Sequence, residues 1–150
     1  MKILCVLYDD PKSGMPKSYP LSDLPKLEKY PDGMTLPNPK GRDFTPGELL
    51  GCVSGELGLR KFLESNGHEY IVTNSKDGDG NEADKHIVDA DIVISQPFFP
   101  YYLTKEKIAK AKNLKMAITA GIGSDHVDLQ AAMDNNIDVV EVTFCNSRSV

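Results

Sequence analysis

The ten residues 119–128, TAGIGSDHVD, place a glycine on each side of Ile122 and follow an apolar run. Glycines let a backbone approach a ligand closely, and a helix that follows presents free N–H groups and the positive end of its dipole. This loop therefore has the chemistry to hold a small carboxylate. Other roles stay open, since Asp125 or Asp128 could cap the following helix and His126 could serve capping or packing rather than catalysis.

The same loop does not complete a dinucleotide-binding fingerprint. The pattern G-x-G-x-x-G needs its third glycine so that the helix and strand can pack closely. Gly121 and Gly123 fit the first two positions, but His126 occupies the third. Glu141 lies roughly where the acidic residue that binds the ribose would follow, which supports the fingerprint only weakly. The spacing thus disfavours a phosphate cradle in this loop.

A second candidate loop is QPFFPYY, residues 96–102, in which four aromatic residues stand beside two prolines. Aromatic side chains at the end of a strand can exclude water from a site, and prolines stiffen the loop that carries them. An apolar lid that merely covers the core is an equally good interpretation.

The remaining candidate motifs each lack a residue that their chemistry requires. Residues 76–82 resemble the start of a calcium loop but lack its glycine and its final glutamate, so an exposed polar turn is predicted. Asp9 and Asp10 resemble the acidic pair of receiver domains, but Ser95-Gln96-Pro97 stands where the phosphoacceptor aspartate should be. Cys145 has no histidine placed near it by sequence and is predicted to be a small packing residue.

Apolar strands and amphipathic helices alternate along most of the chain and must position both loops. This alternation predicts a doubly wound α/β fold with a parallel sheet of about five strands. Right-handed crossovers then bring the candidate loops to the carboxyl ends of the strands. The predicted strands are 2–8, 69–73, 90–95, 114–120 and 137–142, and the predicted helices cover 45–66, 81–88, a segment from Thr104 to Ala111, and 128–135.

Residues 9–48 are different in character, because eight of the ten prolines lie between Pro11 and Pro46. Such density excludes regular helices and central strands. The apolar residues of this segment favour an extended conformation that wraps over the domain, and a disordered linker is the alternative. After residue 142 the sequence reads as a loop entering a helix, so Val150 is predicted to be a truncation point.

Composition limits the class of protein. A chain of 150 residues suits one domain, and 17 basic against 22 acidic residues disfavour a nucleic-acid surface. The chain has no apolar run of membrane-spanning length and no signal-peptide pattern, so no membrane association and a cytoplasmic location are expected. Cys5, Cys52 and Cys145 are widely spaced, which supports neither a disulfide framework nor a metal site.

Several stretches together resemble the N-terminal part of bacterial NAD-dependent formate dehydrogenases, which belong to the D-2-hydroxyacid dehydrogenase superfamily. They are LCVLYDD, FTPGELLGCVSGELGLRKFLESNGHEYIVT, ADIVISQPFFPYYLT, AKNLKMAITAGIGSDHVDLQ and VVEVTFCNS. The resemblance implies that residues 1–146 form the first segment of a flavodoxin-like substrate (catalytic) domain. Residues 147–150 would begin the connection to an NAD-binding domain that this chain lacks, in a homodimer that transfers hydride from formate to NAD+.

Roles for individual residues follow from the same resemblance. The Ile122 N–H and the Asn146 carboxamide would hold the formate oxygens, and no metal is implied. The hydrophobic wall of the substrate pocket would be Pro97 and Phe98, with Phe99 and Tyr102 adding to it. The residues implied on the nicotinamide side are Gly123, Ser147 and Val150.

Two other functions are compatible with the residues. The chain could belong to another D-2-hydroxyacid dehydrogenase that acts on a larger acid, although the aromatic pair Phe98 and Phe99 is expected to fill the space beside Ile122. It could also be a free-standing flavodoxin-like binding or regulatory domain. The fragment alone is expected to be inactive if the formate dehydrogenase interpretation holds.

Overall fold

The computed structural model describes residues 1–7 and 59–142. The chain divides into two units, Met1–Tyr8 with Gly67–Val150 and Asp9–Asn66, which are described separately. In the second unit the described element is helix α1 (Arg60–Ser65), the end of the helix predicted over 45–66. The start of that helix and the predicted wrapping segment 9–48 lie outside the described residues.

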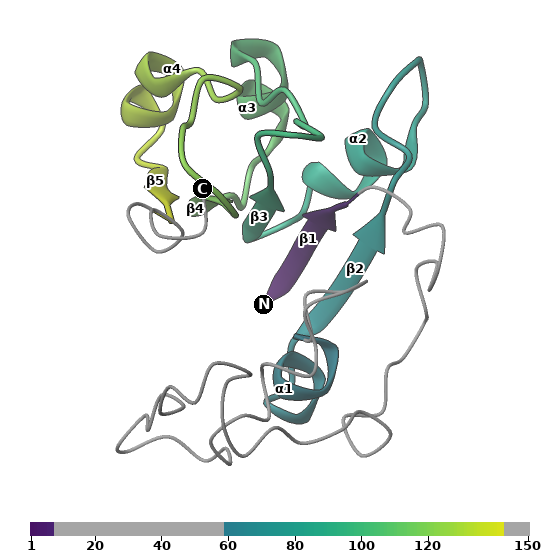
Figure 1. Cartoon of the computed structure of the whole chain (residues 1–150). Coiled ribbons are helices and arrows are strands. Elements are labelled where there is room, and N and C mark those ends of the chain that lie inside the picture. Colours follow the sequence, from purple (N-terminus) through teal and green to yellow (C-terminus); the bar gives the residue numbers. More distant parts are fainter. Residues whose placement is uncertain (8–58, 143–150) are drawn as a thin grey trace, which may run out of the picture. The chain divides into compact units, whose positions relative to one another are not determined.

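The first unit contains a sheet in which five strands are all parallel, as predicted from the alternating sequence pattern. The strands lie side by side in the order β2-β1-β3-β4-β5 (Figure 1). This is the flavodoxin-like order of a doubly wound sheet. The strands are β1 (Lys2–Val6), β2 (Glu69–Thr73), β3 (Ile92–Ser95), β4 (Met116–Thr119) and β5 (Asp138–Glu141), and their ends lie within two residues of the predicted ones.

Three short helices connect the strands from β2 to β5: α2 (Glu82–Ile87), α3 (Lys105–Lys110) and α4 (Leu129–Asp134). Because these strands succeed one another across the sheet, right-handed crossovers place their helices on one face. Accordingly, α2 packs beside α3, and α3 packs beside α4.

The N-termini of α2 and α4 are capped by side chains. The side chain of Asn81 accepts a hydrogen bond from the Asp84 N–H at 2.8 Å, and that of Asp128 accepts one from the Ala131 N–H at 2.9 Å. Thr104 occupies the N-cap position of α3, but its side chain makes no capping hydrogen bond. Of the two predicted candidates for capping α4, Asp128 therefore fills the role.

The core lies between the sheet and these helices, and β1, an interior strand, is buried on both faces as its apolar sequence predicts. The side chains of Ile3, Leu4, Cys5 and Val6 are at most 2% exposed. Helix α3 and its flanking residues contribute Leu103, Ile108 and Ala111 to the buried set, while its lysines lie on other sides.

A buried tyrosine fixes the loop after β3 to two helices. The Tyr101 side chain is 1% exposed, and its hydroxyl donates to the Asp84 carboxylate at 2.7 Å. The Lys107 ammonium lies 2.8 Å from the same oxygen and 4.1 Å from the centre of the tyrosine ring. Burial opposes ionisation of Asp84, but the hydrogen bonds from Lys107 and Tyr101 outweigh it and hold the pKa of this carboxyl below its usual range. Helices α2 and α3 thus share one charge-assisted anchor for the loop.

We expect Tyr101→Phe to reduce the free energy of unfolding by about 1.5 kcal/mol, because it removes a hydrogen bond to a charged acceptor while keeping the buried ring. Chemical denaturation at neutral pH measures the difference. The matched control is Tyr102→Phe, since that side chain is 59% exposed. Its effect should stay within about 0.5 kcal/mol.

The contribution of Asp84 should depend on pH in a definite direction. The pKa of this group is lower in the folded than in the unfolded protein, so its stabilisation is complete above the unfolded value and is lost as pH falls through the folded value. Asp84→Asn should therefore flatten the loss of stability on acidification. An unchanged acid unfolding profile would show that this carboxyl is not the anchor described.

Candidate active site

The candidate site begins where two neighbouring strands end. Ser95 of β3 and Thr119 of β4 are register partners, and the Ala120 N–H donates to the Ser95 carbonyl at 2.7 Å. Because parallel strands end at the same edge of a sheet, the loops that follow them emerge side by side. The two candidate loops were predicted from the sequence to follow these strands, and the pairing of β3 with β4 brings the loops together.

The first loop, residues 96–102, is held in shape by backbone groups. The Phe99 N–H donates to the Gln96 carbonyl at 3.3 Å, which closes a tight turn, and the Tyr101 N–H donates to the Ser95 hydroxyl at 2.9 Å. Together with the Tyr101 anchor to Asp84, these bonds fix both ends of the loop. A loop fixed in this way can present a preformed surface to a ligand.

The two loops are also bonded to each other. The Leu103 N–H donates to the His126 carbonyl at 2.8 Å, and the Asp128 N–H donates to the Leu103 carbonyl at 3.0 Å. This short parallel bridge joins the residues just before α3 to those just before α4. The space between the loops is therefore bounded at one end by main-chain hydrogen bonds and at the other by the sheet.

Glycines in the second loop have two distinct functions. A Cβ at Gly121 would lie 2.8 Å from Cδ and 3.0 Å from Cγ of Pro97, so only glycine permits this close approach of the two loops. Gly123 has φ +96°, a conformation that side-chain-bearing residues rarely adopt. Its N–H donates to the carboxylate of Glu141, so this acidic residue anchors the loop within the protein.

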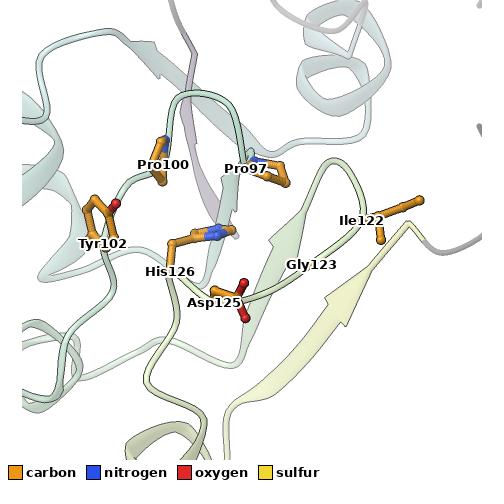
Figure 2. A pocket seen from close by; sticks show the side chains of 7 residues that line it. All are labelled: Pro97, Pro100, Tyr102, Ile122, Gly123, Asp125 and His126. Carbon is orange, nitrogen blue, oxygen red and sulfur yellow. The ribbon is translucent and has the colours of Figure 1, made fainter. Parts of the chain in front are cut away.

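A small surface pocket of about 150 Å³ lies between the loops (Figure 2). The first loop contributes two prolines and a tyrosine, and the second contributes the residues around the glycine turn. The lining residues are Pro97, Pro100, Tyr102, Ile122, Gly123, Asp125 and His126.

Two residues that line this pocket carry a polar group with no hydrogen-bond partner in the described part of the chain. Among the described residues, no hydrogen bond involves the Ile122 N–H. His126 is 6% exposed, and its Nε2 atom is buried without a hydrogen-bond partner in the described part of the chain. Burial lowers the pKa of the imidazole, and the nearby Asp125 carboxylate opposes this only in part. The site therefore combines a free amide donor with a neutral buried imidazole.

The structure places the predicted site residues in three groups. Pro97, Tyr102, Ile122 and Gly123 line the pocket. Phe98 is 91% exposed and lies outside the pocket lining, whereas Phe99 packs against the core, with the Lys76 ammonium 4.6 Å from its ring centre. The other predicted residues, Asn146, Ser147 and Val150, lie outside the described residues.

Three residues of the pocket were not assigned to a site from the sequence: Pro100, Asp125 and His126. All three belong to the two loops that the sequence singled out. Their position after β3 or β4, rather than their residue type, was therefore the signal that could have identified them as site residues. For His126, the sequence left open whether its role is structural or functional.

Within residues 1–7 and 59–142, no three histidine, cysteine or acidic side chains gather in a way that could hold a metal ion. In the same part of the chain, no helix has the length and apolar character needed to cross a membrane.

The described residues thus form an open parallel α/β sheet with a pocket at the carboxyl ends of β3 and β4, which is where doubly wound α/β proteins bind their ligands. The sequence matches the D-isomer specific 2-hydroxyacid dehydrogenase family, catalytic domain, over residues 56–150. The chain belongs to this family.

Among individual proteins, the chain is 68% identical to the formate dehydrogenase of Pseudomonas sp. (strain 101), over 99% of this chain and 37% of that protein. A solved formate dehydrogenase from Granulicella matches with a TM-score of 0.72 and 64% identity, over 97% of this chain and 39% of that one. An NAD-dependent formate dehydrogenase from Staphylococcus aureus in complex with NAD matches with a TM-score of 0.62 and 37% identity, over 97% and 34%. The chain thus spans less than two fifths of the length of these relatives.

Proposed function

We propose that this chain is the first segment of the substrate domain of an NAD-dependent formate dehydrogenase, which oxidises formate to carbon dioxide. Residues 1–146 would belong to this domain, and residues 147–150 would begin the connection to an NAD-binding domain. Support comes from the high identity to formate dehydrogenases over nearly the whole chain and from the greater length of those relatives.

The observation that carries the proposal is the pocket between the two loops. It is small, about 150 Å³, and one of its lining residues, Ile122, has an N–H that no group in the described part of the chain uses. A carboxylate oxygen is the acceptor that such a donor lacks. Asn146 would hold the second oxygen, as the resemblance implies. The identity to formate dehydrogenases favours formate over the larger acid of other D-2-hydroxyacid dehydrogenases.

The described residues do not form a complete dinucleotide site, so most of the NAD contacts must come from elsewhere in the enzyme. The third position of the fingerprint is His126, a buried side chain where close packing of helix and strand needs glycine. Glu141, which stands where a ribose ligand would follow, instead accepts a hydrogen bond from Gly123. Gly123, Ser147 and Val150 would meet only the nicotinamide end of the cofactor.

The task of this chain in the reaction is to orient the substrate and exclude water. NAD+, when bound, accepts the hydride from the formate carbon, and the rest of the substrate leaves as carbon dioxide. Because no proton has to be moved, the Ile122 N–H and Asn146 need only hold the carboxylate in the reactive orientation. Pro97 lines the pocket with apolar surface and limits access of water, and we propose that Phe98, which is highly exposed here, completes this wall in the whole enzyme.

The proposal has two further parts: the whole enzyme would act as a homodimer, and it would work in the cytoplasm.

Steady-state kinetics of the full-length protein with NAD+ test this function. Formate should be oxidised, whereas glycolate and D-lactate should be poor substrates, because the relatives of high identity are formate dehydrogenases. Turnover of a larger 2-hydroxy acid with no turnover of formate would refute the proposal and favour the other dehydrogenase class. Turnover of neither would favour a binding or regulatory domain.

A further inference from the structure

His126 is buried in the wall of the pocket without any assigned role. Its side chain is 6% exposed and extends from the second loop toward the prolines of the first (Figure 2). The residue lines the same pocket as Ile122, whose N–H is unused in the described part of the chain. Two residues of one pocket wall thus each carry a hydrogen-bonding group for which the described part of the chain offers no partner.

The surroundings of the imidazole explain why Nε2 finds no partner among the described residues. Pro97 and Pro100 also line the pocket, and their side chains can neither donate nor accept a hydrogen bond. A buried polar group without a hydrogen bond is costly, and native proteins keep such groups mainly where a ligand or an ordered water satisfies them. An apolar side chain of similar size would fill the same space without that cost.

The fold does not need the imidazole nitrogens. The bond that ties the two loops together uses the backbone carbonyl of His126, which accepts from the Leu103 N–H at 2.8 Å. The N-terminus of α4 is capped by Asp128, so the histidine side chain is not required there either. A polar side chain at this position is therefore explained by the pocket rather than by the fold.

We propose that His126 is a substrate-binding residue whose Nε2–H donates a hydrogen bond to the carboxylate in this pocket, alongside the Ile122 N–H. This inference rests on the proposed function and deepens it, since it adds a specificity-determining contact from this chain. It assigns to the second loop both a backbone donor and a side-chain donor for the same small anion.

The protonation state suits this role. A carboxylate only accepts hydrogen bonds, so Nε2 must carry the proton. Burial favours the uncharged imidazole, which lowers its pKa, and the neutral ring has one proton to place on either nitrogen. A bound carboxylate beside Nε2 would select the tautomer that carries the proton there.

Two substitutions in the full-length protein separate hydrogen bonding from packing. His126→Phe keeps a ring of similar size and removes both nitrogens, whereas His126→Gln places an amide nitrogen close to the position of Nε2. For His126→Phe we expect the KM for formate to rise about 10- to 100-fold, as for a lost bond to a charged partner, and the KM for NAD+ to change less than about 2-fold. His126→Gln should recover most of the formate affinity.

A second measurement does not depend on the variants folding. With histidine labelled by ¹⁵N in the unsubstituted protein, the Nε2 resonance of His126 should shift on titration with formate. An unshifted resonance, or a His126→Phe variant that folds and keeps its KM for formate, would overturn the inference while leaving the proposed function intact. Failure of the unsubstituted full-length protein to oxidise formate would instead refute the proposed function, and the inference with it.

Discussion

Gly121→Ala should reduce kcat/KM for formate about 100-fold in the full-length protein, since a displacement near 1 Å can cost that much in a positioned site. The added Cβ would lie 2.8 Å from Cδ of Pro97, so the loops after β3 and β4 must move apart. The Ile122 N–H is the next amide along the chain and would move with the loop. We also expect the free energy of unfolding to fall by about 1–3 kcal/mol, as for other overpacked sites.

The clash itself can be tested with a second substitution. Pro97→Ala removes the two ring atoms that the new methyl group would meet, so adding Gly121→Ala to that variant should cost little further stability. Denaturation of the two single variants and the double variant measures this coupling. Additive losses of stability, or a Gly121→Ala protein as active as the unsubstituted one, would contradict the close contact.

Asn146→Ala should reduce kcat/KM for formate roughly 10- to 150-fold in the full-length protein. The expected loss of about 1.5–3 kcal/mol is that of a hydrogen bond to a charged partner. Asn146 lies outside the described residues, so this role rests on the resemblance of the sequence to formate dehydrogenases. Steady-state kinetics with formate as the varied substrate measure the effect.

Asn113→Ala provides the matched control, because Asn113 lies on an exposed turn before β4, away from the carboxyl edge of the sheet. Its kinetics should equal those of the unsubstituted protein. If Asn146→Ala also has the kinetics of the unsubstituted protein, Asn146 does not bind the substrate, while the Ile122 N–H would remain the proposed donor.

The sheet could be predicted because its signal lies within short stretches of sequence. The apolar run at Lys2–Val6 predicts a strand buried on both faces, and the alternation of strands and helices predicts a parallel sheet. The choice between Asp125 and Asp128 as the cap of α4 was harder, because both are suitable residues close to the same helix. It depends on where the helix begins, which sequence reasoning places only within a few residues.

The site was predicted less completely than the sheet. The sequence identified both loops and the possibility that Ile122 offers its backbone to a ligand. It could not show that Gly121 meets Pro97, or that the ring of His126 lies buried in the pocket wall, because both depend on contacts between segments far apart in the chain. For Phe98, the apolar residue type predicted a place in the wall of the pocket, and its side chain is 91% exposed in the described structure.

The central claim is that this chain holds formate for direct hydride transfer to NAD+, and deuterium-labelled formate tests it most directly. The full-length protein should convert DCOO⁻ and NAD+ into carbon dioxide and reduced cofactor that carries the deuterium on its nicotinamide ring, as mass spectrometry would show. Reduced cofactor without the label, or no reduction with formate at all, would contradict the account.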